Sequence, residues 1–290
     1  MGVAQLTMLN SMASNDFETG LRLQKAWGLK WVDLRDEIYG RWVEELDLPM
    51  AERIVRAVDE QGLGIYCVST NVFVADVDGG EAMFRSHLQS LRRVVSLCEL
   101  LRPQLVRLNA PSFAGRSVGH NSIETIRQRY PWLVVVCREA VDLLTDAGVL
   151  ACFENDAFDC CLSTPEEFID FFGWLDRPRA AGLTWDVQNQ WASGVFPTLD
   201  IYRQLKPLIR YCHVKGGQCE GNSDRLAWNV ALEDASWPVA DITSAVVSDG
   251  VSPVICLNPA QHGHQKPGYN YEGIVSRDLA YLRRSVPGIE

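Results

Sequence analysis

Four short apolar runs in the second half of the chain each end in a residue that can bind a metal or move a proton. They are residues 149–156, 182–189, 209–215 and 253–258. Successive side chains of a strand alternate between its two faces. If each run is a strand, Glu154, Asp186, His213 and Asn258 lie at the C-terminal strand ends, with Lys215 on the same face as His213. Four strands then deliver polar groups to one place.

The same alternation of strand and helix extends over the whole chain. Further strands are predicted at residues 3–9, 31–34, 64–74 and 105–109, and a helix follows each of the eight strands. Strict alternation over 290 residues without a linker is typical of the α/β class and predicts a single (β/α)8 TIM barrel over residues 1–290. An open doubly wound sheet is the rival, but residues 10–14 lack the glycines of a dinucleotide-binding turn and the lysine of a P-loop.

Local signals place several helix ends. Asp16 can cap the first helix, and Pro49 sits at the start of the second. Thr164 and Glu167 have the spacing of a capping box around a helix start. A helix is predicted over residues 81–101, and a long helix is predicted to end at Ala147.

Composition excludes several classes of function. The net charge of −10, without a basic stripe, argues against nucleic-acid binding. Because no apolar run approaches about 18 residues, no membrane span is expected. Residues at the N-terminus lack the pattern of an export signal, so export is not expected either. The nine cysteines lack metal-type CxxC spacing and several lie in apolar runs, so buried reduced thiols and a cytoplasmic location are expected. The expected partner is a small-molecule substrate.

Other polar residues at strand ends are candidates for substrate binding. Arg35, Asn71 and Asn109 end the second, third and fourth strands, where they can bind hydroxyl or carboxylate groups or simply cap loops. His262 and His264, in the loop after the last strand, are either a solvated pair or a replacement ligand for a metal.

The motifs Phe-Glu-Asn at Glu154, Thr-Trp-Asp at Asp186 and His-Val-Lys at His213, with the strand before Asn258, resemble the xylose-isomerase-like barrels. This family includes sugar and sugar-phosphate isomerases and epimerases, dehydratases and endonuclease IV. The resemblance implies Glu154, Asp186, His213 and Asn258 as metal ligands, although the family has glutamate at the last position. With only five histidines in the chain, the trinuclear zinc site of endonuclease IV is not expected.

Two other positions depart from the family pattern, because Asn189 replaces a frequent histidine and Gly216 replaces a frequent aspartate. Asn189 is retained as a predicted substrate-binding residue. Two carboxylates, an imidazole and an amide oxygen still suit Mn²⁺ or Mg²⁺, with Zn²⁺ and Co²⁺ as alternatives. Because Asn258 cannot accept a proton, ordinary two-base epimerisation of a ketose is not expected.

Single-base chemistry on a sugar-like or cyclic polyol substrate is therefore predicted. Glu154 removes a proton next to a carbonyl, and the metal held with His213 joins Lys215 in stabilising the enolate. Reprotonation gives an isomerase- or epimerase-like reaction, whereas loss of a β-leaving group gives a lyase or dehydratase. A non-catalytic ligand-binding role is the third alternative, and the resemblance also allows a homodimer.

Overall fold

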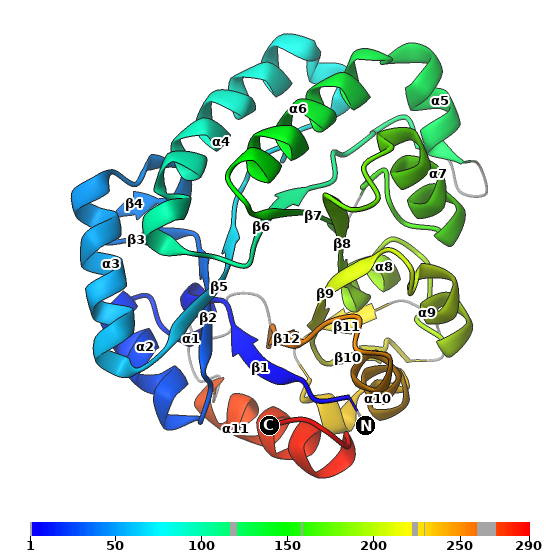
Figure 1. The fold of residues 1–290 in the computed structure, drawn as a ribbon. Coiled ribbons are helices and arrows are strands. Elements are labelled where there is room, and N and C mark those ends of the chain that lie inside the picture. Colours follow the sequence, from blue (N-terminus) through cyan, green and yellow to red (C-terminus); the bar gives the residue numbers. More distant parts are fainter. Residues whose placement is uncertain (1, 117–120, 158, 222–225, 229, 260–270) are drawn as a thin grey trace.

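Eight parallel strands form a nearly closed barrel, which confirms the predicted fold (Figure 1). The computed structural model describes residues 2–116, 121–157, 159–221, 226–228, 230–259 and 271–290. The strands are β1 (Gln5–Met8), β2 (Trp31–Arg35), β5 (Gly64–Ser69), β6 (Leu105–Asn109), β7 (Leu150–Glu154), β8 (Ala181–Asp186), β9 (Ile209–Val214) and β12 (Val254–Leu257). Their order is β1-β12-β9-β8-β7-β6-β5-β2, and a parallel bridge between Leu9 and Asp33 brings β1 and β2 together.

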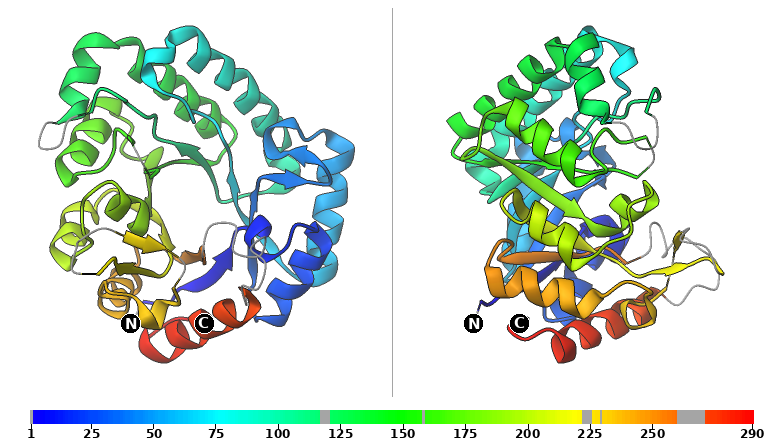
Figure 2. Two further views of the ribbon diagram at one scale, coloured as in Figure 1. Left: turned by 180° about the vertical axis from the view of Figure 1, so that it is seen from behind. Right: turned by 90° about the vertical axis from the view of Figure 1, so that its right-hand side faces the viewer.

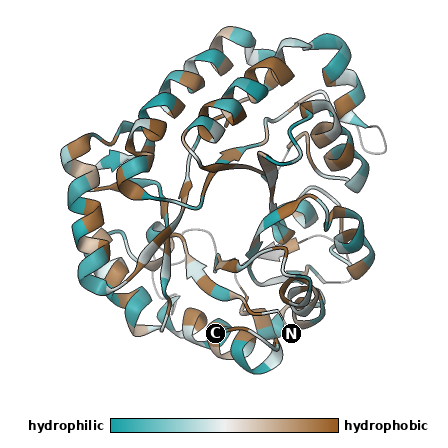
Figure 3. Cartoon of the chain, in the orientation of Figure 1, coloured by the Kyte–Doolittle hydropathy of each residue, from teal (hydrophilic) through white to brown (hydrophobic). Residues whose placement is uncertain are grey.

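Helices surround the barrel and turn their apolar sides toward it, as the brown inner faces in Figure 3 show. The outer helices are α2 (Phe17–Ala26), α3 (Leu48–Gln61), α4 (Glu81–Leu101), α5 (Ser122–Arg129), α6 (Trp132–Asp146), α7 (Pro165–Leu175), α9 (Leu199–Leu205), α10 (Val239–Asp249) and α11 (Tyr271–Ser285). Because they cover the sheet on its outer side, the strands are buried on both faces and read as continuous apolar runs.

Several short elements lie in the connections between the barrel strands and the outer helices. They are the helices α1 (Asn10–Ala13) and α8 (Val187–Ala192), the 3₁₀ turns η1 (Val43–Glu45), η2 (Val77–Gly79) and η3 (Leu232–Asp234), and the hairpins β3 (Glu37–Ile38) with β4 (Arg41–Trp42) and β10 (Gly217–Cys219) with β11 (Leu226–Trp228). The β10–β11 hairpin follows the C-terminal end of β9, and the right-hand view of Figure 2 shows its yellow ribbon extending away from the barrel.

The predicted helix starts have the expected hydrogen bonds. The Asp16 carboxylate accepts the Thr19 N–H at 2.8 Å and caps α2. At α7, Thr164 accepts the Glu167 N–H at 3.3 Å, and Glu167 accepts the Thr164 N–H at 3.0 Å, which is the predicted capping box. These local signals therefore fixed the entry points of helices that cover the barrel.

Two predicted boundaries are wrong. The strand expected over residues 64–74 ends at Ser69, because the Thr70 hydroxyl donates to the Arg107 carbonyl and accepts the Val72 N–H, which turns the chain out of the barrel. The long helix expected to end at Ala147 is divided into α5 and α6. Pro131 lies between them and disfavours helical backbone at the residue before it, so Tyr130 leaves the helical conformation with φ −129° and ψ 54°.

All nine cysteines are free thiols; eight are buried and Cys219 is half-buried, as expected for a reduced protein. Among the described residues, no helix combines the length and the apolar character that crossing a bilayer requires.

Candidate metal centre and active site

A cleft of about 180 Å³ opens at the C-terminal ends of the strands, where (β/α)8 barrels place their active sites. It gathers seven of the predicted site residues: Arg35, Asn109, Glu154, Asp186, Asn189, Lys215 and Asn258. His213 lies beneath them with 1% of its surface exposed. A larger hollow of about 570 Å³, lined by Val149, Leu150 and Ala180 among others, lies at the opposite ends of β7 and β8. The convergence of ionisable groups makes the smaller cleft the candidate site.

Glu154, Asp186 and His213 meet at the bottom of this cleft. Their ligand atoms lie within 4.8 Å of one another. Nδ1 of His213 is 2.8 Å from Oε1 of Glu154 and 3.9 Å from Oδ2 of Asp186. Since β7, β8 and β9 are successive strands in the sheet, residues far apart in sequence arrive at one point.

Each carboxylate is anchored through one oxygen and presents the other to His213. Oε2 of Glu154 lies 3.0 Å from Nε of Arg107, which leaves Oε1 facing the imidazole. Oδ1 of Asp186 accepts the N–H of Asn189 at 2.9 Å as the N-cap of α8, which leaves Oδ2 facing the same ring. Two oxygens and one nitrogen are thus held in a fixed arrangement that can bind a cation.

Arg107 is a site residue that the sequence analysis missed. It lies on β6 with 2% of its surface exposed, and its Nη1 donates to Oδ1 of Asn109 at 2.8 Å and to the Thr70 carbonyl at 2.9 Å. Burial by itself would raise the pKa of Glu154, but the opposing charges of Arg107 first and His213 second hold this pKa well below its usual range. The available signal was a charge inside an apolar strand, on the same face as Asn109.

Asn155 is a second missed residue, and it joins the ends of β7 and β8. Its side-chain amide donates to the Asp186 carbonyl at 2.8 Å and accepts the Asp186 N–H at 2.9 Å. Its own carbonyl accepts the side-chain N–H of Asn189 at 3.0 Å. These three bonds fix the backbone that carries both carboxylates.

Lys215 projects into the cleft as the parity of β9 predicts. Its ammonium lies 2.9 Å from Oδ2 of Asp186 and donates to Oδ1 of Asn189 at 3.1 Å. The next residue, Gly216, departs from the family pattern for a steric reason. A Cβ at Gly216 would lie 1.9 Å from the Val230 carbonyl oxygen, so no side chain fits there.

The predicted substrate-binding residues separate into two groups. Arg35 lines the cleft, pairs with Asp36 at 3.1 Å and donates to the Thr70 carbonyl at 3.0 Å. Asn109 also lines it. Asn71 is not among the residues that line the cleft. It follows the early end of β5, and its backbone N–H donates to the Glu44 carboxylate.

Four polar atoms, from three residues of the site, have no hydrogen bond inside the described part of the chain. They are Oδ2 of Asp186, both ring nitrogens of His213 and Oδ1 of Asn258, all buried. Oδ2 of Asp186 lies close to Lys215, and Nδ1 of His213 lies close to Glu154, but neither contact has the geometry of a hydrogen bond. Buried polar atoms normally find partners, so these residues fit a divalent cation. His262 and His264 lie outside the described residues.

Two cations already balance the two carboxylates. Arg107 pairs with Glu154, and Lys215 pairs with Asp186. The negative charge of the candidate metal group formed by Glu154, Asp186 and His213 is therefore partly neutralised by these two residues.

Comparison with known proteins identifies related folds. A family model described as xylose isomerase-like TIM barrel matches residues 21–283. No curated protein sequence matches the chain significantly.

Three similar solved structures are a xylose isomerase-like TIM barrel protein from Mycobacterium smegmatis in complex with magnesium, a probable 3-DHS dehydratase AsbF from Bacillus anthracis and a D-allulose 3-epimerase from Methylomonas sp.. The Mycobacterium protein is 15% identical with a TM-score of 0.71, and the alignment covers 98% of this chain and 96% of that chain. The dehydratase is 16% identical with a TM-score of 0.71, covering 96% of this chain and 98% of that chain. The epimerase is 11% identical with a TM-score of 0.73, covering 98% of both chains. At these identities the likeness establishes the fold.

Proposed function

Because the chain belongs to the xylose isomerase-like TIM barrel family, we propose that it is a divalent-metal-dependent enzyme of the isomerase or epimerase kind. It removes a proton next to a carbonyl in a sugar-like or cyclic polyol substrate. The convergence of Glu154, Asp186 and His213 within 4.8 Å at the C-terminal cleft carries this proposal. Solved structures with the same fold include epimerases and a dehydratase, and others hold magnesium or zinc, which supports this class.

The metal is Mg²⁺ or Mn²⁺, held by Glu154, Asp186 and His213 with Asn258 as a weak fourth ligand; Zn²⁺ and Co²⁺ are the alternatives. Oxygen-rich sites favour the first two ions. When bound, the cation polarises the substrate carbonyl and so acidifies the neighbouring C–H bond.

Glu154 is the base. Its lowered pKa keeps it ionised at neutral pH, so it is ready to accept a proton, although it is a weak base that requires an acidified substrate. Lys215 lies on the other side of Asp186 and places its ammonium in the cleft. There it neutralises the oxyanion that develops during proton removal, and it can supply a proton.

The remaining polar residues orient the hydroxyl groups of the substrate. Arg35, Asn109 and Asn189 line the cleft. The guanidinium of Arg35 and the two amides offer donors and acceptors of the kind that polyol hydroxyls require. Their placement supports a substrate with several hydroxyl groups.

Elimination is the second candidate, and one observation favours it. Asn258, the residue after β12, has an amide that cannot take up a proton, so this position supplies no second base beside Glu154. An enolate that is not reprotonated on its opposite face can expel a β-hydroxyl, to which Lys215 delivers the proton. The enzyme would then be a lyase or dehydratase.

Elemental analysis of protein purified without chelator is the first test. We expect about one Mg, Mn, Co or Zn per chain, lost in a Glu154→Ala/His213→Ala double variant. Absence of metal from the wild type, even after resupply, would contradict the proposal.

Deuterium exchange in ²H₂O is the second test, with ketoses and cyclic ketones screened as substrates. Glu154→Gln should slow exchange by at least about 10²-fold, whereas the exposed control Glu52→Gln should not change it. Exchange with an unchanged carbon skeleton and no loss of water indicates isomerisation, and release of water to an enone indicates elimination. A metal-loaded protein that exchanges no substrate would support the third alternative, a ligand-binding role.

A further inference from the structure

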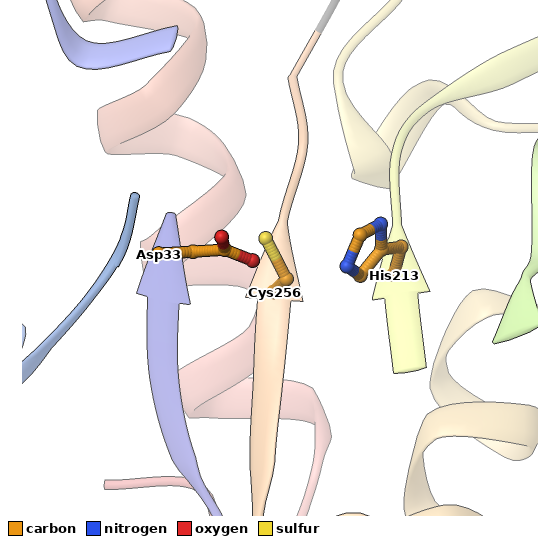
Figure 4. A group of neighbouring side chains, drawn as sticks. All are labelled: Asp33, His213 and Cys256. Atoms are coloured by element: carbon orange, nitrogen blue, oxygen red, sulfur yellow. The ribbon is translucent and has the colours of Figure 1, made fainter. Parts of the chain in front are cut away.

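A second group of buried side chains lies directly behind His213. Asp33 from β2, Cys256 from β12 and His213 from β9 point toward one another across the barrel interior (Figure 4). An Asp33 oxygen, the Cys256 sulfur and a His213 ring nitrogen lie within 4.8 Å of one another, and none of the three residues exposes more than 1% of its surface. Asp33 is a charge inside an apolar strand and is not among the predicted site residues.

A carboxylate at this depth requires partners, since burying an unpaired charge is expensive. Oδ2 of Asp33 accepts the hydroxyl of Tyr211 at 2.9 Å. Oδ1 makes no hydrogen bond within the described residues, and neither does Nε2 of His213. An acceptor and a potential donor are therefore both unsatisfied in the same small volume.

The two nitrogens of His213 face different surroundings. Nδ1 lies 2.8 Å from Glu154 and points to the proposed metal site. Figure 4 shows the other ring nitrogen directed toward Cys256 and Asp33. A neutral imidazole carries one proton, so Nδ1 can offer a lone pair to a cation only when the proton is on Nε2. That proton then needs an acceptor in the interior.

We propose that Asp33 is a positioning residue that accepts the Nε2 proton of His213 and thereby holds Nδ1 as the metal-binding atom. The inference rests on the proposed function, because it assigns a role toward the metal of that site. Tyr211 in turn holds the Asp33 carboxylate through the other oxygen. Histidine ligands commonly donate their second N–H to a carboxylate, which fixes the tautomer and the ring orientation.

A metal bound directly by Asp33, Cys256 and Nε2 is the rival arrangement. The cleft is lined by Glu154 and Asp186, whereas Asp33 and Cys256 are not among its lining residues. His213 does not line the cleft either, but its Nδ1 lies 2.8 Å from Oε1 of Glu154, which does, so His213 stands between the cleft and the pair Asp33 and Cys256. This favours a hydrogen bond from Nε2 of His213 to Asp33 over a metal bound by Asp33 and Cys256. The experiments below distinguish the two arrangements.

Mn²⁺ affinity, measured from the EPR signal of the free ion, tests the proposal without any substrate. We expect Asp33→Asn and Asp33→Ala to weaken Mn²⁺ binding by about 10–100-fold. Asparagine has nearly the same shape but can turn its N–H toward Nε2, which favours the wrong tautomer. Cys256→Ala is the matched control from the same cluster and should bind Mn²⁺ like the wild type. Circular dichroism and the melting temperature establish that each variant is folded.

Co²⁺ loading supplies a readout that a purely structural role would not change. The imidazole N–H of a Co²⁺-bound histidine gives a strongly shifted, solvent-exchangeable NMR signal. We expect this signal in the wild type and in Cys256→Ala, and its loss through fast exchange in folded Asp33→Ala. A sulfur-to-cobalt charge-transfer band that disappears in Cys256→Ala would place the metal on the thiolate and overturn the proposal.

The outcomes distinguish a failure of the role given to Asp33 from a failure of the proposed metal site. If the wild type binds Mn²⁺ and both Asp33 variants bind it equally well, the role of Asp33 is wrong and the proposed metal site stands. If the wild type binds neither Mn²⁺ nor Co²⁺, the proposed function fails and the role of Asp33 falls with it.

Discussion

The guanidinium of Arg107 lies 3.0 Å from the carboxylate of Glu154, and fewer than a tenth of either side chain is exposed. Removal of one member of a buried pair leaves the other charge uncompensated, so Arg107→Ala should lower the free energy of unfolding by about 3–5 kcal/mol. Urea unfolding at pH 7 measures the change. Arg92→Ala is the control, because the Arg92–Glu139 pair is exposed and should contribute less than about 1 kcal/mol. An equal decrease in the free energy of unfolding in both variants would show that the buried Arg107–Glu154 pair contributes no more to stability than an exposed pair.

Replacement of Lys215 should move metal affinity and catalysis in opposite directions. Its ammonium lies 2.9 Å from Oδ2 of Asp186, the oxygen that faces His213, and so competes with a cation. Lys215→Met should therefore bind Mn²⁺ several-fold more tightly while proton exchange falls by about 10²–10⁴-fold, the range typical of a lost acid or base. Isothermal titration and deuterium exchange measure the two effects. A parallel loss of both would indicate a structural role for Lys215.

A carboxylate at position 258 should strengthen metal binding. The side-chain oxygen of Asn258 is buried in the site and has no hydrogen bond within the described residues. Asn258→Glu adds a negative ligand, and affinity for hard cations rises with ligand charge, so Mn²⁺ should bind at least about tenfold more tightly. Asn258→Gln keeps the amide and serves as the control. Unchanged affinity in Asn258→Glu would mean that the end of β12 does not reach the metal.

Asp278 should make the protein less stable as the pH rises toward neutrality. It is buried on α11, where its Oδ1 accepts the Leu232 N–H at 2.6 Å, and burial raises its pKa to about 7. Since the ordinary value is 3.8, the folded state binds the proton more tightly than the unfolded state. The stabilisation is complete below about pH 4 and is lost as the pH rises through about 7, by at most about 1.4 kcal/mol per pH unit.

Unfolding free energies of the wild type and Asp278→Asn, measured between pH 5 and pH 8, check this expectation. The variant keeps an acceptor for Leu232 but has no proton to lose, so its stability should fall less over this interval. Identical pH profiles would rule out the titration of Asp278 as the cause.

Much of the architecture was predictable because its signals are local. Apolar runs separated by capping signals such as Thr164 and Pro165 identified strands and helices without knowledge of their partners. Alternation of side chains then placed Glu154, Asp186 and His213 on inward faces. Where prediction failed, a nearby group decided the outcome, as at Thr70, whose hydroxyl turns the chain toward the Arg107 carbonyl and ends β5 early.

The pairing of charges inside the barrel was not predictable in the same way. Tyr211 and Asp33 are 178 positions apart, and their hydrogen bond depends on closure of the barrel. In the sequence, Arg107 is a single charge within an apolar strand. Its ion pair with Glu154 depends on β6 and β7 being neighbours in the barrel.

By itself, the sequence determined where each of the eight strands lies, although not the end of β5, and which side chains lie on the inward faces, since both follow from local periodicity. Only the tertiary structure decided that Arg107 anchors Glu154, that Lys215 neutralises Asp186 and that Asp33 stands behind His213. Those relationships depend on the order and register of strands around the barrel, and register is set by the packing of the whole chain.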